Sequence, residues 1–109
     1  MQTDKTETIQ LLKKEIENGS TRAMCQYAIM LRDGDGIPVN KKEATRLFKK
    51  AIDKGDIDAM HSYALMLSMD PKTVKESIRY YKMAIDKGNT LSMNNYATML
   101  STGEGVPQD

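Results

Sequence analysis

The side chains that could carry out chemistry in this sequence are few, and the most reactive pair is Cys25 and His61. They are the only cysteine and the only histidine in the chain. A thiol beside an imidazole can act as a base-activated nucleophile when the two groups lie within hydrogen-bond distance. Repeat alignment places both residues at equivalent positions of neighbouring helices, which pack about 9–10 Å apart. We therefore expect no catalytic pair, and so few soft ligands argue against a bound metal ion.

A second candidate is the segment Asp33-Gly-Asp-Gly36, which resembles the start of a calcium-binding loop. The rest of that loop is missing, because Pro38 stands where glycine is needed and Ala44 where a bidentate glutamate is needed. The glycine pair alone is weak evidence for a phosphate site, since the Ile37-Pro38 that follows is typical of a structural turn. The sequence therefore predicts no cofactor and no metal, and we expect a protein that is not an enzyme.

Charge and hydropathy exclude further classes of function. Sixteen Lys and Arg stand against fifteen Asp and Glu, a formal net charge of +1, whereas nucleic-acid binders usually present a strongly basic surface. No apolar run approaches the roughly 20 residues that a membrane helix needs, and the first residues lack the apolar core of a secretory signal. A single cysteine favours a reducing compartment. We expect a cytoplasmic protein that contacts neither nucleic acid nor membrane.

Internal repetition is the strongest signal in the sequence, and it determines which elements hold the side chains above. Three segments align through identical columns: Met24, Met60 and Met93; Tyr27-Ala28, Tyr63-Ala64 and Tyr96-Ala97; Met30, Met66 and Met99; Leu31, Leu67 and Leu100. Two further motifs recur with consistent offsets, Ala51-Ile-Asp-Lys-Gly55 as Ala84-Ile-Asp-Lys-Gly88 and Gly34-Asp-Gly-Ile-Pro38 as Gly103-Glu-Gly-Val-Pro107. The chain is therefore a repeat protein.

Each repeat predicts two helices, which we name A and B. In the first A helix, Met24, Tyr27, Ala28 and Leu31 follow the i, i+3, i+4, i+7 spacing of one apolar stripe. The predicted fold is all-α, an α/α superhelical solenoid of antiparallel helix hairpins, with helices near residues 4–18, 20–33, 41–54, 56–69, 71–87 and 89–102. We expect the repeated columns to be buried, namely Tyr27, Tyr63, Ala28, Ala64, Leu31, Leu67 and the six aligned methionines.

The predicted helix ends carry the residue types that stop and start helices. Gly19, Gly55 and Gly88 stand where a helix needs a left-handed residue after its last turn. The residues that follow them are good N-caps, Ser20, Asp56 and Asn89. Asn40 with Glu43 resembles a reciprocal cap, and Asp70-Pro71 predicts proline at the first helical position.

The repeat resembles Sel-one-like repeats (SLR), relatives of the tetratricopeptide repeats (TPR). The family pattern is matched by Ala23-x3-Tyr27-Ala28-x2-Leu31-x2-Gly34-x-Gly36-Ile37, then Glu43-Ala44 and Ala51-x3-Gly55. The chain departs from that pattern in two places. Tyrosine and leucine have exchanged columns, and the second repeat lacks the Gly-x-Gly loop. The resemblance covers about residues 8 to 109.

We divide the chain, residues 1–109, as a single repeat domain. Residues 4–19 form an N-terminal half-repeat or cap, 20–55 the first repeat, 56–88 the second and 89–109 a truncated third. The A helix of the third repeat carries Met93, Tyr96, Ala97 and Leu100, and we expect part of this stripe to be exposed. Fraying after about Leu100, or burial of Tyr96 and Leu100 against another chain, would follow, so self-association through this end is possible.

Each A helix carries a second stripe, roughly 130° around the helical wheel from the first. By resemblance to TPR-type superhelices, this stripe lines the concave face, where partner segments dock. Its members are Arg22, Cys25, Ile29 and Arg32; Asp58, His61, Leu65 and Ser68; and Leu91, Asn94, Thr98 and Ser101. The favoured hypothesis is a protein-interaction module, an adaptor or scaffold that binds a protein or peptide segment along these helices. The alternative is a structural segment that assembles through its open ends.

Overall fold

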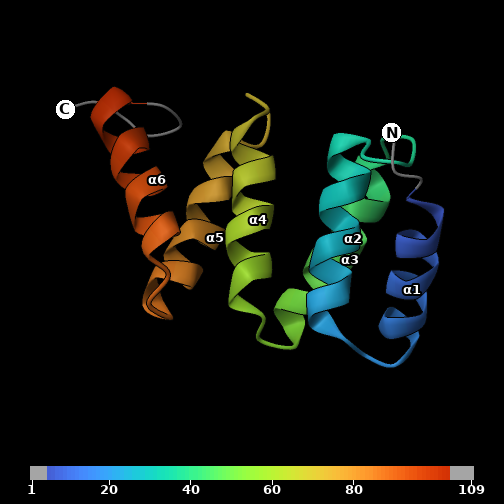
Figure 1. Ribbon diagram of the computed structural model, residues 1–109. Coiled ribbons are helices and arrows are strands. Elements are labelled where there is room, and N and C mark those ends of the chain that lie inside the picture. Colours follow the sequence, from blue (N-terminus) through green and yellow to red (C-terminus); the bar gives the residue numbers. More distant parts are fainter. Residues whose placement is uncertain (1–4, 104–109) are drawn as a thin grey trace. The chain divides into compact units, whose positions relative to one another are not determined.

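A computed structural model describes residues 5–103, which form six helices (Figure 1). These are α1 (Thr6–Glu17), α2 (Thr21–Asp33), α3 (Lys41–Asp53), α4 (Ile57–Ser68), α5 (Val74–Asp86) and α6 (Thr90–Thr102). No strand occurs in the part of the chain that is described. The all-α prediction is confirmed, and α2, α4 and α6 are the A helices, whereas α3 and α5 are B helices.

The helices form two compact units, Met1–Asp56 and Ile57–Asp109. In the N-terminal unit, α2 packs against both α1 and α3. The core between α2 and α3 is made by Met24 and Ala28 on one side and by Phe48 and Ala51 on the other, all of them with no exposed surface. Leu12 is the buried contribution of α1. The apolar stripe predicted for the first A helix is therefore part of this core.

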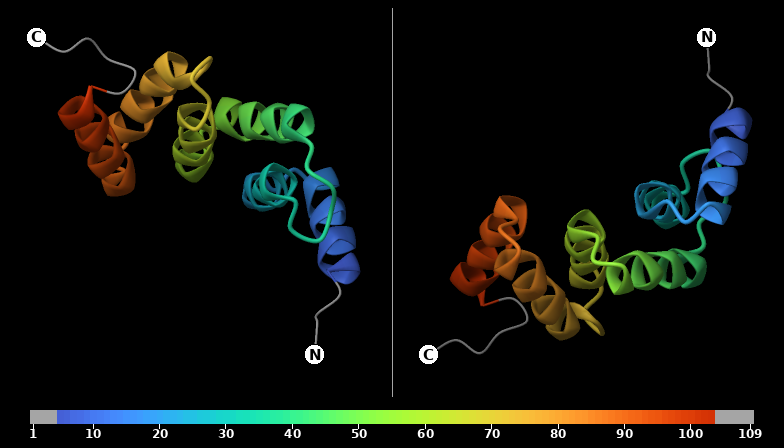
Figure 2. Two further views of the ribbon diagram at one scale, coloured as in Figure 1. Left: turned by 90° about the horizontal axis from the view of Figure 1, so that it is seen from above. Right: turned by 90° about the horizontal axis from the view of Figure 1, so that it is seen from below.

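In the C-terminal unit, α5 packs against α4 and also against α6, and α5 and α6 lie side by side (Figures 1 and 2). Tyr81 of α5 is 1% exposed and is the largest fully buried side chain. Tyr63 of α4 meets Tyr80 of α5 edge to face, with ring centroids 4.8 Å apart. Such pairs add stabilisation beyond the area that they bury. The α4–α5 pair is therefore built around tyrosines.

Of the residues expected to be buried, one is not. The six Tyr, Ala and Leu positions of α2 and α4 are all less than 9% exposed, and so are five of the six aligned methionines. Met93 of α6 is 42% exposed. The prediction that it fills the core is wrong, whereas the expectation that part of the Met93, Tyr96, Ala97 and Leu100 stripe is exposed is confirmed, because no described helix covers Met93.

The turns out of α1, α3 and α5 have one geometry. Gly19, Gly55 and Gly88 have φ of 88°, 89° and 88°, which confirms the predicted left-handed conformation. In the last turn, the amide of Gly88 donates to the carbonyl of Ile85 at 2.8 Å and that of Asn89 donates to Ala84 at 3.0 Å. This pair of bonds satisfies the carbonyls that a helix end leaves open. The identical pentapeptides Ala-Ile-Asp-Lys-Gly therefore encode one C-terminal cap.

The N-caps are confirmed in part. The side chains of Ser20, Asn40 and Asn89 each accept a bond from the amide three residues later, at 3.1, 3.1 and 2.7 Å. The reciprocal cap at α3 is wrong, because the backbone amide of Asn40 donates to Leu31 and the Glu43 carboxylate pairs with Arg46. The hydrogen bond between the Glu43 and Arg46 side chains lowers the pKa of Glu43 and raises the pKa of Arg46.

The start of α5 also differs from the prediction. Pro71 lies in a turn, and the helix begins at Val74. The carboxylate of Asp70 accepts from the amide of Lys72 at 2.9 Å, and the hydroxyl of Thr73 donates to the carbonyl of Leu67 at 2.7 Å. These side-chain bonds fold residues 70–73 into a separate turn before the helix starts.

Leu31→Ala should destabilise the protein by about 2–4 kcal/mol, because Leu31 is 3% exposed and its removal leaves a cavity. Urea unfolding followed by circular dichroism measures this cost. Leu11, which is 59% exposed on α1, is the matched control, and Leu11→Ala should change stability by no more than about 0.5 kcal/mol. Equal effects of the two substitutions would contradict the core assignment.

Gly88→Ala should cost about 1–2 kcal/mol through backbone strain alone. A Cβ atom at Gly88 would meet nothing within 4 Å, so no steric clash contributes. Gly88→Asn is the control, because asparagine tolerates the left-handed conformation better and should recover part of the loss. If alanine is tolerated as well as asparagine in thermal melts, the strain argument fails.

Candidate functional site

The twelve residues of the second stripe, which we name the A-helix face, lie on α2, α4 and α6. Four of them, on α2, belong to the N-terminal unit. The eight on α4 and α6 belong to the C-terminal unit, where the structure gives their mutual arrangement.

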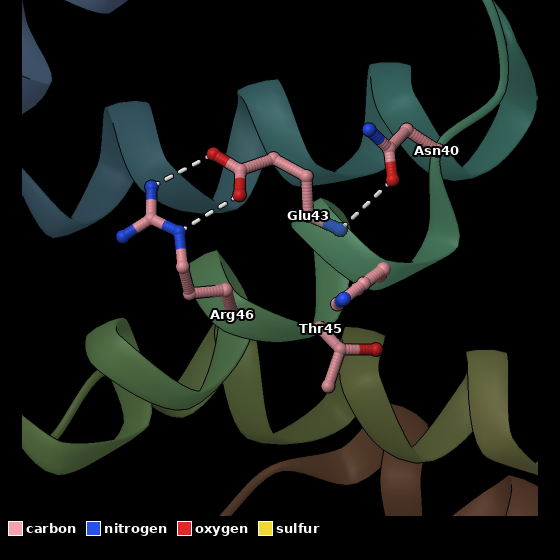
Figure 3. Close-up of a pocket in the computed structure, with 5 residues that line it drawn as sticks. Asn40, Glu43, Thr45 and Arg46 are labelled. Atoms are coloured by element: carbon pink, nitrogen blue, oxygen red, sulfur yellow. Dashed lines mark hydrogen bonds and ion pairs between the residues drawn. The ribbon is translucent and has the colours of Figure 1, made fainter.

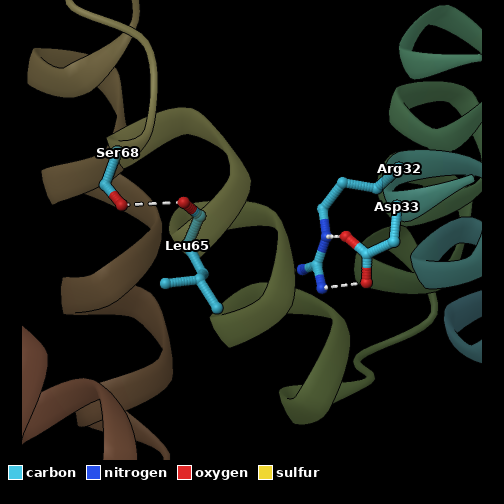
Figure 4. A network of polar contacts seen from close by, with 4 residues as sticks. All are labelled: Arg32, Asp33, Leu65 and Ser68. Atoms are coloured by element: carbon cyan, nitrogen blue, oxygen red, sulfur yellow. Dashed lines mark hydrogen bonds and ion pairs between the residues drawn. The ribbon is translucent and has the colours of Figure 1, made fainter. Parts of the chain in front are cut away.

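On α2, the A-helix face is only partly accessible. Arg22 is exposed and Ile29 is half-buried, whereas Cys25 is 6% exposed. The side chain of Arg32 is 13% exposed and forms a two-bond ion pair with Asp33, at 2.8 and 3.0 Å (Figure 4). This hydrogen-bonded pair lowers the pKa of the Asp33 carboxyl. The thiol of Cys25 is therefore not a surface group, and the charge of Arg32 is already matched.

In the C-terminal unit, the structure brings three predicted residues together. Leu65 and Ser68 of α4 and Thr98 of α6 line one hollow of about 180 Å³. Tyr81 of α5, with Asn95 and Met99 of α6, completes its lining. Tyr81 and Met99 are buried, so they form the floor, and the other four residues form the rim. The hollow is smaller than the roughly 300–1,000 Å³ of small-molecule sites and has the size for one side chain of a partner.

Three of the four rim residues of the hollow are polar, whereas Leu65 on the rim and Met99 and the Tyr81 ring on the floor are apolar. The hydroxyl of Ser68 donates to the carbonyl of Leu65 at 2.7 Å (Figure 4), and that of Thr98 donates to the carbonyl of Asn94 at 3.0 Å. Both hydroxyl protons are thus committed to the helix backbone, which leaves oxygen lone pairs as acceptors. Asn95 adds an amide that carries donors and an acceptor. The hollow can therefore pair with polar groups around an apolar side chain.

Sequence reasoning missed half of this lining. Met99 was assigned to the core, which is where it lies, and Tyr81 of α5 is buried as well, but each also presents an edge to the hollow. Asn95 follows Asn94 of the predicted stripe and lies on the side of α6 that faces α4. Asn95 directly follows a stripe residue on an A helix that lies beside another A helix, and this position is the signal that could have found it.

The remaining predicted residues of this unit do not line the hollow. Asp58, Leu91, Asn94 and Ser101 are exposed. Leu91 is 62% exposed, which makes it an apolar surface residue of the same helix outside the hollow.

His61 joins α4 to the start of α6. Its Nδ1 lies 2.8 Å from the hydroxyl oxygen of Ser92, and its ring lies 6.0 Å from that of Tyr81. The amide of Ser92 in turn donates to the cap side chain of Asn89. Burial lowers the pKa of His61 below its ordinary value of 6.5, and the nearby Asp58 carboxylate opposes this shift.

A serine bonded to a histidine is also the arrangement of a nucleophile and its base. Ser92 has no exposed surface, so no substrate carbonyl can reach its oxygen. The equivalent positions of the other A helices are Ala23 and Ala59, which are buried as well. Ser92 therefore occupies a core position that is alanine in the other A helices, and its hydroxyl is hydrogen-bonded to His61.

Two larger hollows lie in the N-terminal unit. One, of about 370 Å³, is lined by the first turns of α3 from Asn40 to Arg46 (Figure 3). The other, of about 340 Å³, lies where Lys13, Tyr27 and Leu47 approach one another. Glu43 and Arg46 line both hollows and are already paired at 2.7 Å. In the second hollow, the ammonium of Lys13 lies 5.9 Å from the centre of the Tyr27 ring. A ligand would have to displace these contacts.

No cluster of three or more His, Cys, Asp or Glu that could hold a metal ion occurs in residues 5–103. Within the same range, no helix is both long and apolar enough to cross a membrane.

The family model described as Sel1 repeat matches residues 21–56, 57–89 and 90–109, most of the chain. The chain belongs to the Sel1 repeat family. The resemblance seen in the sequence is thereby confirmed. Members of the Sel1 family are generally protein-interaction scaffolds and are typically not enzymes. No match was found among curated proteins.

Solved structures show the same fold. A Sel1 repeat protein from Oxalobacter formigenes superposes with a TM-score of 0.81 at 23% identity, over 94% of this chain and 43% of the other. A protective antigen of uropathogenic Escherichia coli with an SLR fold gives 0.76 at 25% identity, over 90% and 22%. The chain spans less than half the length of either structure. The likeness places this Sel1 repeat protein in the class of all-α helical-repeat solenoids.

Because burial lowers the pKa of His61, the folded state disfavours its protonation. The resulting stabilisation is present above the ordinary histidine pKa and is lost as the pH falls through the lowered one. We expect the melting temperature to fall between about pH 7.5 and about pH 5 by an amount that depends on His61. The difference in melting temperature between the wild type and His61→Asn, the residue of the equivalent Asn94, measures that share. If both proteins lose the same stability over this range, His61 is not its source.

Proposed function

We propose that this Sel1 repeat protein binds a segment of another protein along the A helices of its C-terminal unit. The observation that carries the proposal is the hollow between α4 and α6, lined by Leu65, Ser68 and Thr98 over Tyr81 and Met99. An apolar centre surrounded by polar groups is the usual composition of a protein interface, and here Leu65, Met99 and the Tyr81 ring lie beside Ser68, Asn95 and Thr98. The hollow provides an anchor point for one apolar side chain, and the rim supplies hydrogen-bond partners.

Two features favour a protein segment over a small molecule. The hollow of about 180 Å³ is open and too small to enclose a metabolite. It also lies on rigid helices rather than on loops, a geometry that suits docking without rearrangement. Asp58, exposed at the start of α4, and Asn94, exposed on α6, extend the polar surface on the same two helices. A partner that spans several residues can use all of these groups.

The proposal includes an adaptor role and a cytoplasmic setting. Residues 1–109 hold one cysteine, so they can form no internal disulfide, and that thiol is buried. Both features suit a reducing compartment. The net charge of +1 leaves the partner's charge unspecified, so shape and hydrogen bonding would determine the choice of partner.

A peptide library tests the proposal. Selection of phage-displayed random linear peptides on the purified chain should enrich sequences with a central apolar residue. Leu65→Lys should weaken their binding at least about tenfold, because an ammonium would occupy the hollow. Leu11→Lys, at a residue 59% exposed on α1, is the matched control and should bind as the wild type does.

Melting curves of both variants must first show that each is folded. Enrichment of peptides that bind the two variants equally, or no enrichment at all, would refute the hollow as the binding site.

A further inference from the structure

The exposed sides of the two B helices carry the same charged residues in the same order. When α3 and α5 are aligned on their shared Ala-Ile-Asp-Lys-Gly ends, both have lysine, arginine, lysine and aspartate at four exposed positions. The spacing of i, i+4, i+7 and i+11 places the four on one side of each helix. We name these sets the charged columns: Lys42, Arg46, Lys49 and Asp53 on α3, and Lys75, Arg79, Lys82 and Asp86 on α5.

The charged columns are identical although the core of the same two helices has changed. Three buried positions differ between α3 and α5, namely Ala44 against Ser77, Leu47 against Tyr80 and Phe48 against Tyr81. Packing constrains core residues, whereas exposed substitutions usually change stability little, so repeats are expected to diverge first at the surface. The A helices follow that expectation, because one of their exposed positions is Arg22, Asp58 and Leu91 in turn. A constraint other than packing therefore acts on the charged columns.

The stability of the single helix does not supply that constraint. The first turn of a helix favours a carboxylate and the last turn favours a cation. Each column has the reverse order, with a lysine as the second residue of the helix and an aspartate as the last. The arginine also follows the first lysine by one turn, where like charges repel. The order of charges is therefore unfavourable within the isolated helix.

Contacts inside the chain do not account for the columns either. Arg46 pairs with Glu43 at 2.7 Å, but the equivalent Arg79 instead lies 5.6 Å from the centre of the Tyr80 ring. Within residues 5–103, Arg46 is the only column cation that forms an ion pair. The lysines and Arg79 can therefore pair with carboxylates from outside the chain.

We infer that the charged columns of α3 and α5 each bind an acidic segment of a partner protein. The order of charges defines the segment, which needs three carboxylates followed by one cation. Column members lie about 4.5–6 Å apart along the helix axis, at about 1.5 Å per residue. Alternate residues of an extended chain lie about 6.6 Å apart, and the long lysine and arginine side chains absorb the difference. A segment with acidic residues at three alternate positions and a basic residue at the fourth therefore fits.

The aspartate at the end of each column favours a protein segment over a phosphate-bearing partner. A nucleic-acid strand or an anionic membrane would present negative charge to Asp53 and Asp86 as well as to the cations. A peptide can place a lysine or an arginine there. No column residue lines the hollow between α4 and α6, so the inference does not rest on the function proposed for that hollow.

A synthetic peptide tests the inference. It carries glutamates at three alternate positions, a lysine at the fourth and serines between them, and it is titrated into the ¹⁵N-labelled chain. Single exposed ion pairs contribute little, so we expect weak, saturable binding. Amide signals of α3 and α5 should shift, whereas those of Leu65 and Thr98 should not. The affinity should fall at least about fivefold when NaCl is raised from about 50 mM to about 500 mM, because salt screens exposed charges.

Two double variants locate the site. Lys42→Glu combined with Lys75→Glu should weaken binding at least about fivefold, because each substitution reverses one charge of a column. Both carboxylates would lie in the first turn of a helix, where they are favourable, so the variant should stay folded. Arg22→Glu combined with Lys72→Glu is the matched control, since it reverses two exposed cations outside the columns. It should bind the peptide within about twofold of the wild type.

The order of charges is tested by a peptide of the same composition that has its lysine at the second alternate position. It should bind at least about threefold more weakly. Equal binding of the two peptides, equal weakening by the two double variants, or the absence of shifts in α3 and α5 would overturn the inference. So would tighter binding of a thymidine tetranucleotide or of phosphatidylserine vesicles, because the partner would then be a phosphate-bearing molecule.

Discussion

Close packing of an A helix against a B helix at alanine is the interaction on which each unit depends. Ala28, Ala44 and Ala51 have no exposed surface in the N-terminal unit, nor have Ala64 and Ala84 in the C-terminal unit. Small side chains at the contact bring two helices near the short end of the usual range of separation. Only at that separation do Phe48 and Tyr81 lie fully buried between them. A larger residue at any of these alanines would push the helices apart and expose the aromatic rings.

The same constraint explains why the third A helix differs from the other two. α6 keeps the repeated methionine, tyrosine, alanine and leucine, yet Ala97 is exposed and Leu100 is 52% exposed. Residues of the same type are buried in one repeat and exposed in another, because a side chain is buried only where a second helix packs over it. The helix α6 continues past Leu100 to Thr102 and ends in a left-handed cap at Gly103. Local capping therefore holds the helix while its apolar face stays open.

Polar groups enter these cores only where a hydrogen-bond partner satisfies them, either on a neighbouring helix or in the same helix. Ser92 replaces the alanine of the other A helices, and the imidazole of His61 accounts for its hydroxyl at 2.8 Å. Ser77 of α5 has no exposed surface, and its hydroxyl donates to the carbonyl of Val74. Among the described residues no buried side-chain nitrogen or oxygen lacks a partner. An unsatisfied group would cost roughly 1–3 kcal/mol, a large part of the stability of a small domain.

The sequence by itself determined the repeat, the six helices and the turns between them. These features are local, because periodicity selects the helix and a glycine with left-handed φ ends it. The predicted start of α5 was wrong because hydrogen bonds of the Asp70 and Thr73 side chains compete with the backbone bonds of the helix. Hydrophobic periodicity gives no sign of such bonds. The sequence also grouped Leu65, Ser68 and Thr98 on one stripe. Only the tertiary structure decided that these three surround a hollow, that Tyr81 and Asn95 join them, and that Cys25 is buried. Each of those outcomes depends on which neighbouring helix lies against a side chain, which a one-dimensional pattern does not contain.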